Sequence, residues 1–248
     1  MAKDLFSERA ELYAQYRPTY PEALFAYILS FVKEKKVAWD CATGNGQAAV
    51  RLAQYVERVE ATDISEAQLL NSVQKENIHY QLSPAETTPF ADDTFDLITI
   101  ATAYHWLDWA AFFQEATRVG KPDCVVAAWS TYTIQLPDAA LQDIYHEFYW
   151  NIVGPYWDPE RKYVDEQYLT VAFDFEPLPV QSFQIELVWT KQQFKGYMET
   201  WSATQKYTKA NGKSPLTIID SQLDELWDDS EVKKVFIPLC LRLGRVVK

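Results

Sequence analysis

Val37-Ala-Trp-Asp-Cys-Ala-Thr-Gly-Asn-Gly-Gln-Ala-Ala49 is the stretch that decides how this 248-residue chain folds. It begins with an apolar run typical of a buried strand and ends with residues that favour a helix. Gly44 and Gly46 lie between them and allow a sharp turn that a ligand can approach closely. Backbone amides at the start of the helix point toward the same place. The stretch therefore predicts a strand, a ligand-binding turn and a helix.

Short apolar runs alternate with helical stretches up to about residue 165, which is typical of a parallel sheet with helices on both faces. The expected strands there are Val37–Trp39, Val59–Thr62, Ile78–Gln81, Phe95–Ile100 and Cys124–Trp129. Two later runs, Phe183–Trp189 and Val235–Leu243, are expected to pair as a hairpin at one edge of the sheet. We therefore predict an α/β, Rossmann-like fold with a mostly parallel seven-stranded sheet and an antiparallel last strand.

Residues that favour the N-termini of helices stand between these runs. Pro21 precedes one apolar helical pattern, and Asp108 can cap another over Trp109–Val119. Ser65–Gln68 and Thr190–Gln193 both have the spacing of a capping box. Each of these signals predicts where a helix starts.

After the fifth expected strand the alternation stops. Residues 131–175 contain no good strand pattern and are rich in aromatic side chains, which predicts a helical cap inserted into the sheet domain. No Gly- and Ser-rich linker separates one region of the chain from another. We therefore predict a single domain over residues 1–248.

Composition narrows the class of function. The formal net charge of −12 repels phosphate backbones, so nucleic acid is not expected as a partner. No apolar run is long enough to span a membrane, and the charged N-terminus does not resemble a signal peptide, so we expect a cytoplasmic protein without a membrane partner. Three scattered cysteines and three histidines favour neither a disulfide framework nor a metal site. The oligomeric state is not indicated.

The second expected strand ends at Asp63, about 20 residues beyond the glycine turn, where a carboxylate can accept both hydroxyls of an adenosine ribose. This order of elements predicts a nucleoside-binding half. Gly44-x-Gly46-x-x-Ala49 also fits a dinucleotide fingerprint. Asp40, however, would repel a pyrophosphate beside the turn and attract the cationic S-adenosylmethionine. The alternative for Asp40 is a carboxylate that caps the amides of the turn.

Several segments together resemble a known family. Asp40-x-Ala42-x-Gly44-x-Gly46 matches its glycine loop, with Ala42 where most members have Gly. The other matching segments are Tyr13–Pro21, Ala85-Glu86, Phe95–Ala101, Ala103–Trp106 and Glu115–Val119. In these motifs, over about residues 5–130, the chain resembles the class I S-adenosylmethionine-dependent methyltransferases, and more narrowly the small-molecule branch that includes trans-aconitate methyltransferase-like proteins. The resemblance implies N-terminal lid helices over about 1–32.

The resemblance also implies cofactor contacts. Those with the methionine moiety come from the glycine loop: Asp40, Ala42, Gly44, Asn45 and Gly46. Asp63 is expected to hold the ribose and Ile64 to pack on the adenine face.

On the far side of the cofactor, Ala85 and Glu86 are expected at the adenine edge, although Pro84 stands where relatives commonly have Asp. The Ala101 carbonyl is expected to bind the methionine ammonium, and Tyr13 belongs to the lid. For Arg17 the resemblance offers the cofactor carboxylate or an acidic acceptor as partner, against an exposed arginine at a helix end.

Tyr104, His105 and Trp106 follow the fourth expected strand, at the edge where open α/β sheets bind ligands, and are the candidate catalytic residues. His105 takes a proton from an acceptor or orients it, and the alternative is a histidine that only shapes the pocket. Trp106 and Tyr104 present aromatic faces to the sulfonium, or simply pack.

The sequence thus predicts an enzyme that uses S-adenosyl-L-methionine to methylate a small molecule, at a carboxylate or a hydroxyl, enclosed by aromatic residues of the cap. Such a transfer needs alignment and exclusion of water more than strong acid–base groups. Two alternatives stay open: a nicotinamide-dependent oxidoreductase, and a protein that binds S-adenosylmethionine without catalysis. Lys206, Lys209 and Lys213 attract an anionic acceptor or form a solvated helix face.

Overall fold

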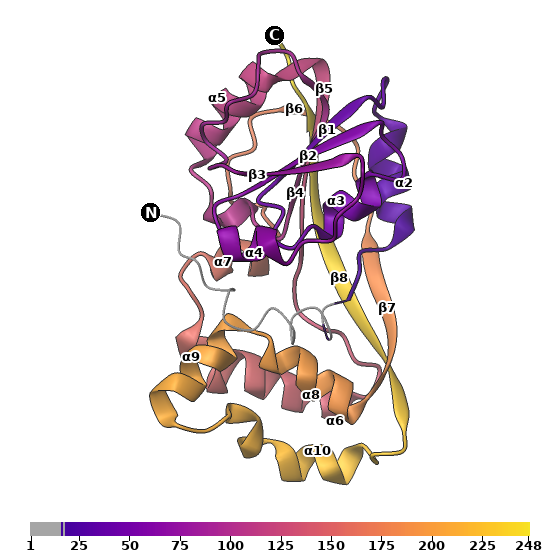
Figure 1. Cartoon of the computed structure of the whole chain (residues 1–248). Coiled ribbons are helices and arrows are strands. Elements are labelled where there is room, and N and C mark those ends of the chain that lie inside the picture. Colours follow the sequence, from indigo (N-terminus) through magenta and orange to yellow (C-terminus); the bar gives the residue numbers. More distant parts are fainter. Residues whose placement is uncertain (1–15, 17) are drawn as a thin grey trace.

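The structure is a computed structural model that describes residue 16 and residues 18–248, so Tyr13 and Arg17 lie outside the described residues. The described chain forms a sheet in the order β3-β2-β1-β4-β5-β8, and β6 and β7 both pair with β8 (Figure 1). The strands are β1 (Val37–Cys41), β2 (Arg58–Asp63), β3 (Ile78–Leu82), β4 (Phe95–Ala101), β5 (Gly120–Thr131), β6 (Glu176–Pro177), β7 (Phe183–Thr190) and β8 (Val232–Arg245).

The pairing of the strands confirms the predicted fold class. Strands β1 to β5 are parallel to one another, and β8 is antiparallel to both β5 and β7. Strand β4 is almost entirely buried, as expected for a parallel strand with helices over both faces. All seven expected strands are present, and the additional β6 has only two residues.

Helices cover both faces of the sheet. On one face, helices α2 (Glu22–Ser30) and α3 (Gln47–Leu52) pack in the same apolar cluster as Ala38. On the other, α5 (Trp109–Val119) packs in the cluster that contains Trp39. Adjacent residues of β1 therefore belong to opposite cores, as the alternation of side chains along a strand requires.

The predicted capping residues begin their helices. Ser65, Asp108 and Thr190 each accept a hydrogen bond from the backbone N–H three residues later, at the starts of α4 (Glu66–Leu70), α5 and α8 (Lys191–Glu199). For Thr190 the reciprocal bond from its own backbone N–H is also made, which completes a capping box.

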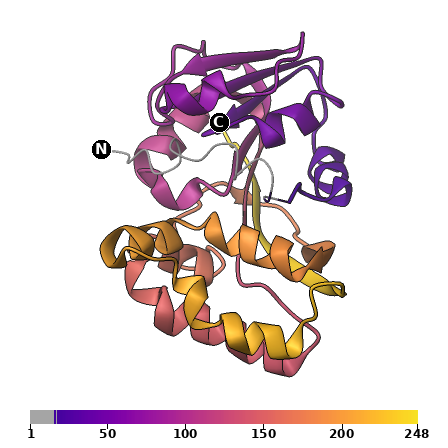
Figure 2. The same ribbon diagram turned by 60° about the horizontal axis from the view of Figure 1, so that its bottom comes forward.

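A second group of helices lies beyond one end of the sheet (Figures 1 and 2). Its members are α6 (Ala139–His146), η3 (Glu147–Ile152), η4 (Gly154–Tyr156), α8, α9 (Ser202–Asn211), η5 (Pro215–Ile218) and α10 (Asp220–Leu226). We call this group the cap helices. The segment 131–175 contributes only the first three, and helices from later in the chain pack on them. Its last helix, α7 (Arg161–Asp165), lies beside the sheet and contacts η2 (Tyr104–Trp106).

The long strand β8 joins the cap helices to the sheet. Its first half, to Leu239, pairs with β7, and its second half pairs with β5. The apolar cluster under α2 and α3 accordingly continues without a break to cap residues such as Tyr145 and Trp201. None of the helices in the described residues is long and apolar enough to cross a membrane.

Candidate active site

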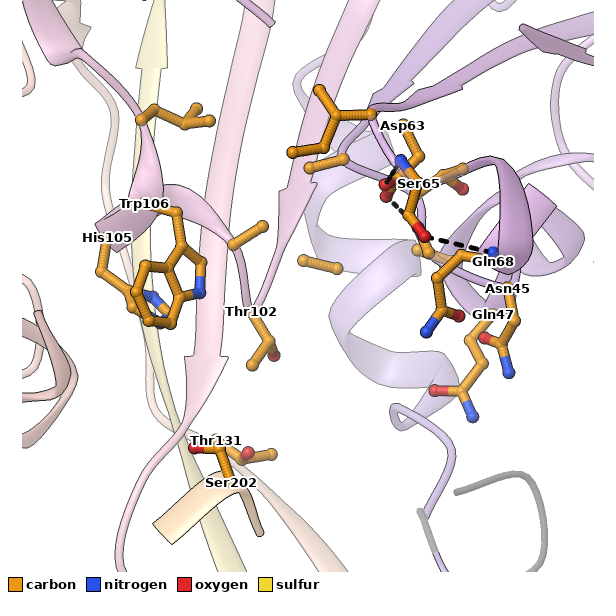
Figure 3. Close-up of a pocket in the computed structure, with 18 of the residues that line it drawn as sticks. Asn45, Gln47, Asp63, Ser65, Gln68, Thr102, His105, Trp106, Thr131 and Ser202 are labelled. Carbon is orange, nitrogen blue, oxygen red and sulfur yellow. Dashed lines mark hydrogen bonds between the residues drawn. The ribbon is translucent and has the colours of Figure 1, made fainter. Parts of the chain in front are cut away.

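A pocket lies at the carboxyl ends of β1, β2 and β4 and is closed on its far side by cap residues. Figure 3 shows His105 and Trp106 on one wall, facing Asp63, Ser65 and Gln68 on the other, with Thr102 between them. The pocket brings together ten of the expected site residues: Ala42, Gly44, Asn45, Asp63, Ile64, Ala85, Glu86, Ala101, His105 and Trp106.

The turn after β1 has left-handed backbone conformations at three positions. The φ angles are +53° at Ala42, +57° at Gly44 and +85° at Gly46. Alanine in this region carries about 1 kcal/mol of strain that glycine avoids. Gly46 is not among the residues that line the pocket, although its neighbours Asn45 and Gln47 are. A Cβ there would lie 2.2 Å from the Tyr80 hydroxyl, so Gly46 is needed for the close packing of Tyr80 on the turn.

Asp63 ties the turn after β1 to the start of α4. Its Oδ2 accepts the Gly44 N–H at 2.8 Å, and its Oδ1 accepts the Ser65 N–H at 2.9 Å. Each carboxylate oxygen can accept more than one hydrogen bond, so this arrangement is compatible with ribose hydroxyls as further donors. The carboxylate thus shapes the turn and also lines the pocket.

Asp40 does not line the pocket, which corrects the expectation that it faces the cofactor. Its fully buried carboxylate accepts hydrogen bonds from Thr43 Oγ1 at 2.5 Å and Thr99 Oγ1 at 2.7 Å. Burial raises the pKa of Asp40 to about 6, against the opposing effect of these bonds and of the Ala49 backbone. Asp40 therefore links the turn to β4 and to the start of α3, mainly through threonine hydroxyls and not through amides of the turn.

The residues expected around the adenine border one side of the pocket. Ile64 is 44% exposed and lines the pocket, so its side chain is open to contact with a ring. Ala85 is buried, and Glu86 accepts the Asp108 backbone N–H at 3.1 Å. Ala101, at the end of β4, lines the pocket between this side and the cap.

Tyr104 is a core residue rather than a catalytic one, which corrects its expected role. Its side chain is 1% exposed, and its hydroxyl donates to the Ala172 carbonyl at 2.6 Å. Its ring packs edge-on against Phe112 and Tyr168. Trp106, by contrast, lines the pocket (Figure 3).

His105 is held in the pocket wall as a neutral imidazole. Its Nδ1 shares a hydrogen bond of 3.0 Å with the Tyr168 hydroxyl. Burial lowers the pKa of His105 to about 3, and the nearby charge of Arg161 lowers it further. A base of this strength does not take up a proton near neutral pH, so the geometry favours the orienting role over proton transfer.

Thr102 is a pocket residue that the sequence did not indicate, and it lies beside Tyr20 of the matching segment Tyr13–Pro21, which also lines the pocket. Thr102 has a φ of +57°, which is rare for a β-branched residue, and its Oγ1 lies 2.9 Å from the Tyr20 hydroxyl. Strained backbone of this kind gathers at functional sites. No sequence signal could have found it, because Gly or Asn usually marks a positive φ.

The cap contributes aromatic and charged residues to the pocket. Of the cap aromatics expected to enclose the acceptor, those that line it are Tyr132, Tyr149, Trp157, Tyr197 and Trp201. Asp158 and Arg161 also line it and were not expected. Lys206, from the basic cluster, forms an ion pair with Asp158 at 2.6 Å. The presence of charged residues within an aromatic-rich segment is the sequence signal that could have identified Asp158 and Arg161.

The residues present fit S-adenosyl-L-methionine. The Asp63 carboxylate suits the ribose hydroxyls, exposed Ile64 suits the adenine face, and Gly44 leaves room beside the turn. An acid at the end of the second strand also binds the ribose of a dinucleotide, so Asp63 does not by itself distinguish the two cofactors. With Asp40 buried, the charge argument against a dinucleotide no longer applies.

Comparisons with known proteins agree with this fit. A family model described as a methyltransferase domain matches residues 39–128. A Dictyostelium discoideum protein named as a methyltransferase is 30% identical over 249 residues, which cover 98% of this chain and 95% of that protein. A solved structure named as a type II methyltransferase, from Anaeromyxobacter dehalogenans, has a TM-score of 0.87 and 32% identity, over 94% of this chain and 99% of that chain.

A more distant solved structure, the YcgJ protein of Bacillus subtilis, shares the fold with a TM-score of 0.53 and 19% identity, over 91% of this chain and 98% of that chain. The similarity to the Dictyostelium protein extends over the sheet and the cap alike. It argues against the oxidoreductase and the non-catalytic alternatives. The chain belongs to the class I S-adenosyl-L-methionine-dependent methyltransferases, and its cofactor is S-adenosyl-L-methionine.

Proposed function

We propose that the enzyme methylates an oxygen atom, a carboxylate or a hydroxyl, of a small and partly apolar molecule bound under the cap helices. The observation that carries this proposal is one continuous pocket with two unlike walls. One wall has the Asp63 carboxylate and the glycine turn, and the other has Trp106, Trp157 and Trp201. The wall with Asp63 and the glycine turn suits the cofactor, and the wall of tryptophans suits the apolar part of a small acceptor molecule.

On the cofactor side, the chain's own residues bind and orient. The Asp63 carboxylate would accept hydrogen bonds from the ribose hydroxyls, Ile64 would pack on the adenine, and the Ala101 carbonyl would accept the ammonium N–H. When bound, S-adenosyl-L-methionine supplies a methyl group that its sulfonium has already activated. The protein therefore needs to align the acceptor with that methyl group and keep water out.

On the acceptor side, the aromatic residues of the cap exclude water and His105 fixes the orientation of the acceptor oxygen. Neutral His105 makes one hydrogen bond to Tyr168 and has a second ring nitrogen for the acceptor. A carboxylate acceptor needs no base at all, which agrees with a histidine whose pKa is about 3. A base-dependent amine acceptor fits these residues less well.

A methyl-transfer screen tests the proposal. The full chain is incubated with S-adenosyl-L-methionine carrying a labelled methyl group and with a panel of small carboxylic acids, alcohols and amines. We expect label to enter carboxylates or hydroxyls and not amines. Label found on nitrogen would contradict the proposal, and tight cofactor binding with no transfer to any compound would favour the non-catalytic alternative.

We expect His105→Ala to lower kcat by about 10-fold or more while S-adenosyl-L-methionine affinity stays within about twofold, because His105 orients the acceptor only. The ratio of wild-type to variant kcat should stay constant from about pH 5 to about pH 9, since a group with a pKa of about 3 does not titrate there. A ratio that rises through a single inflection near neutral pH would mean instead that His105 accepts a proton.

A further inference from the structure

Arg161, at the start of α7, is a cation in the wall of the acceptor side of the pocket. Its side chain is 19% exposed. Its Nε donates to the Tyr149 hydroxyl at 2.8 Å and to Asp165 Oδ1 at 3.2 Å. The two terminal amino groups of the guanidinium have no hydrogen-bond partner among the residues that the structure describes.

An arginine with a purely structural role in so confined a place would use its terminal amino groups, because the paired N–H donors of that end make the strongest contacts with carboxylates. Here Asp165 is engaged through Nε alone. Burial opposes the charge of Arg161, but Tyr149 and Asp165 outweigh burial and raise the pKa of the guanidinium. The guanidinium is therefore fully charged, and its two terminal amino groups can donate hydrogen bonds to a ligand.

The orientation of Arg161 is fixed from two sides. Its guanidinium carbon lies 4.8 Å from the ring centroid of Trp157 and 5.5 Å from that of Tyr149. Tyr149 also donates a hydrogen bond of 2.5 Å to Asp165, so the side chains of Arg161, Tyr149 and Asp165 hold one another. A planar donor group held in this way loses little conformational entropy when it binds a planar anion.

The other charges nearby do not take this role. Lys206, which the sequence singled out as a member of a basic cluster, is paired with the buried Asp158. Trp157 adds a donor rather than an acceptor, because its indole N–H is buried with no partner in the described region of the chain. The pocket wall around Arg161 and Trp157 thus has N–H donors without a hydrogen-bond partner among the described residues.

We propose that Arg161 selects the acceptor by charge: its guanidinium binds a carboxylate that the acceptor carries, while the aromatic residues around it cover the acceptor's apolar body. This inference rests on the proposed function, because it assigns the acceptor half of the same pocket. Arg161 is then a specificity-determining residue supplied by α7, and a neutral analogue of the acceptor leaves its donors unsatisfied at a large cost in affinity.

Matched pairs of probe ligands test this directly. Phenylacetate and 3-phenylpropionate are titrated against phenylacetamide and 3-phenylpropionamide, each into the full chain saturated with the cofactor product S-adenosylhomocysteine, by calorimetry or ligand-observed NMR. Acid and amide have nearly the same shape, so the comparison isolates the charge. We expect each carboxylate to bind at least about 10-fold more tightly than its amide.

Variants assign that preference to one residue. Arg161→Gln should remove the preference for the carboxylate. Arg161→Lys should retain only a fraction of this preference, because an ammonium keeps the charge but lacks the paired, coplanar N–H donors of the guanidinium. Lys162→Gln, which removes an exposed cation next to Arg161 on the same helix, is the matched control and should leave the preference intact. If circular dichroism shows that Arg161→Gln does not fold, the test is the ratio of carboxylate to amide affinity in the wild type compared with that in Arg161→Lys.

The outcomes separate this inference from the proposed function. Failure of the wild type to bind S-adenosylhomocysteine would overturn the proposed function itself. Normal S-adenosylhomocysteine binding with no preference for the carboxylates, including no binding of either probe up to about 10 mM, would overturn the role of Arg161 alone. A preference that survives in folded Arg161→Gln would also overturn it.

Discussion

Asp63→Ala is expected to weaken S-adenosyl-L-methionine binding by about 100-fold or more, equivalent to about 2.7 kcal/mol. The substitution removes the acceptor for the ribose hydroxyls and leaves the Gly44 and Ser65 amides without the carboxylate that they share. Two elements of the pocket, the glycine turn and the start of α4, lose their common anchor. Calorimetric titration with the cofactor measures the loss.

Asp63→Asn provides the control for this experiment. It keeps the size of the side chain and one oxygen acceptor but loses the charge, so its affinity should fall between those of the wild type and Asp63→Ala. Unchanged affinity in a folded Asp63→Ala variant would show that the ribose lies elsewhere. Loss of folding in both variants would instead point to Asp63 as mainly structural.

Gly46→Ala is expected to destabilise the chain by about 2–5 kcal/mol and to weaken cofactor binding in parallel. A left-handed alanine costs about 1–2 kcal/mol, and overpacking against a well-held side chain adds about 1–3 kcal/mol. Tyr80 cannot move away freely, since its hydroxyl, which would lie 2.2 Å from the new Cβ, donates to the Val73 carbonyl at 2.9 Å. Urea denaturation gives the change in the free energy of unfolding.

Gly212→Ala separates the two causes. Gly212, the residue after α9, has a φ of +75° and no heavy atom within 4 Å of an added Cβ, so it carries the backbone strain without the clash. Gly212→Ala should lower the free energy of unfolding only by the backbone contribution of about 1–2 kcal/mol. Combining Gly46→Ala with Tyr80→Phe removes the closest atom and should recover some of the stability. Equal losses for the two glycine variants would refute the role given to Tyr80.

The elements of the sheet could be read from the sequence because their signals are local. Apolar runs marked all seven expected strands, and Ser65, Asp108 and Thr190 marked helix starts through hydrogen bonds that reach only three residues. The cofactor half of the pocket followed for the same reason. Its residues come directly after β1, β2 and β4, and parallel strands bring their carboxyl ends to one edge.

The features that could not be predicted depend on tertiary structure. Whether Asp40 faces the pocket or the interior depends on Thr99, which lies 59 residues away and binds its carboxylate. The positive φ of Thr102 has no sequence signal. Arg161 lines the pocket from a segment that follows β5, and the hydroxyl of Tyr149 that orients it comes from the preceding helix η3.

Similar reasoning explains why the cap was expected to be shorter. Its first segment, 131–175, could be recognised by the loss of strand alternation, but α8 to α10 are separated from it in sequence by β6 and β7. Contacts such as that between the rings of Tyr145 and Phe194 join the two segments. They are long-range packing that no local pattern encodes.

The 14-residue strand β8 has a mechanical consequence. Because the strand is hydrogen-bonded to β5 along one half and to β7 along the other, and β7 runs directly into α8, one strand connects the sheet to the cap helices. Rotating the cap helices outward as a rigid body would bend this strand or break its backbone hydrogen bonds. We therefore expect small molecules to enter and leave through side-chain rotations and local opening at the rim of the pocket rather than through a hinge.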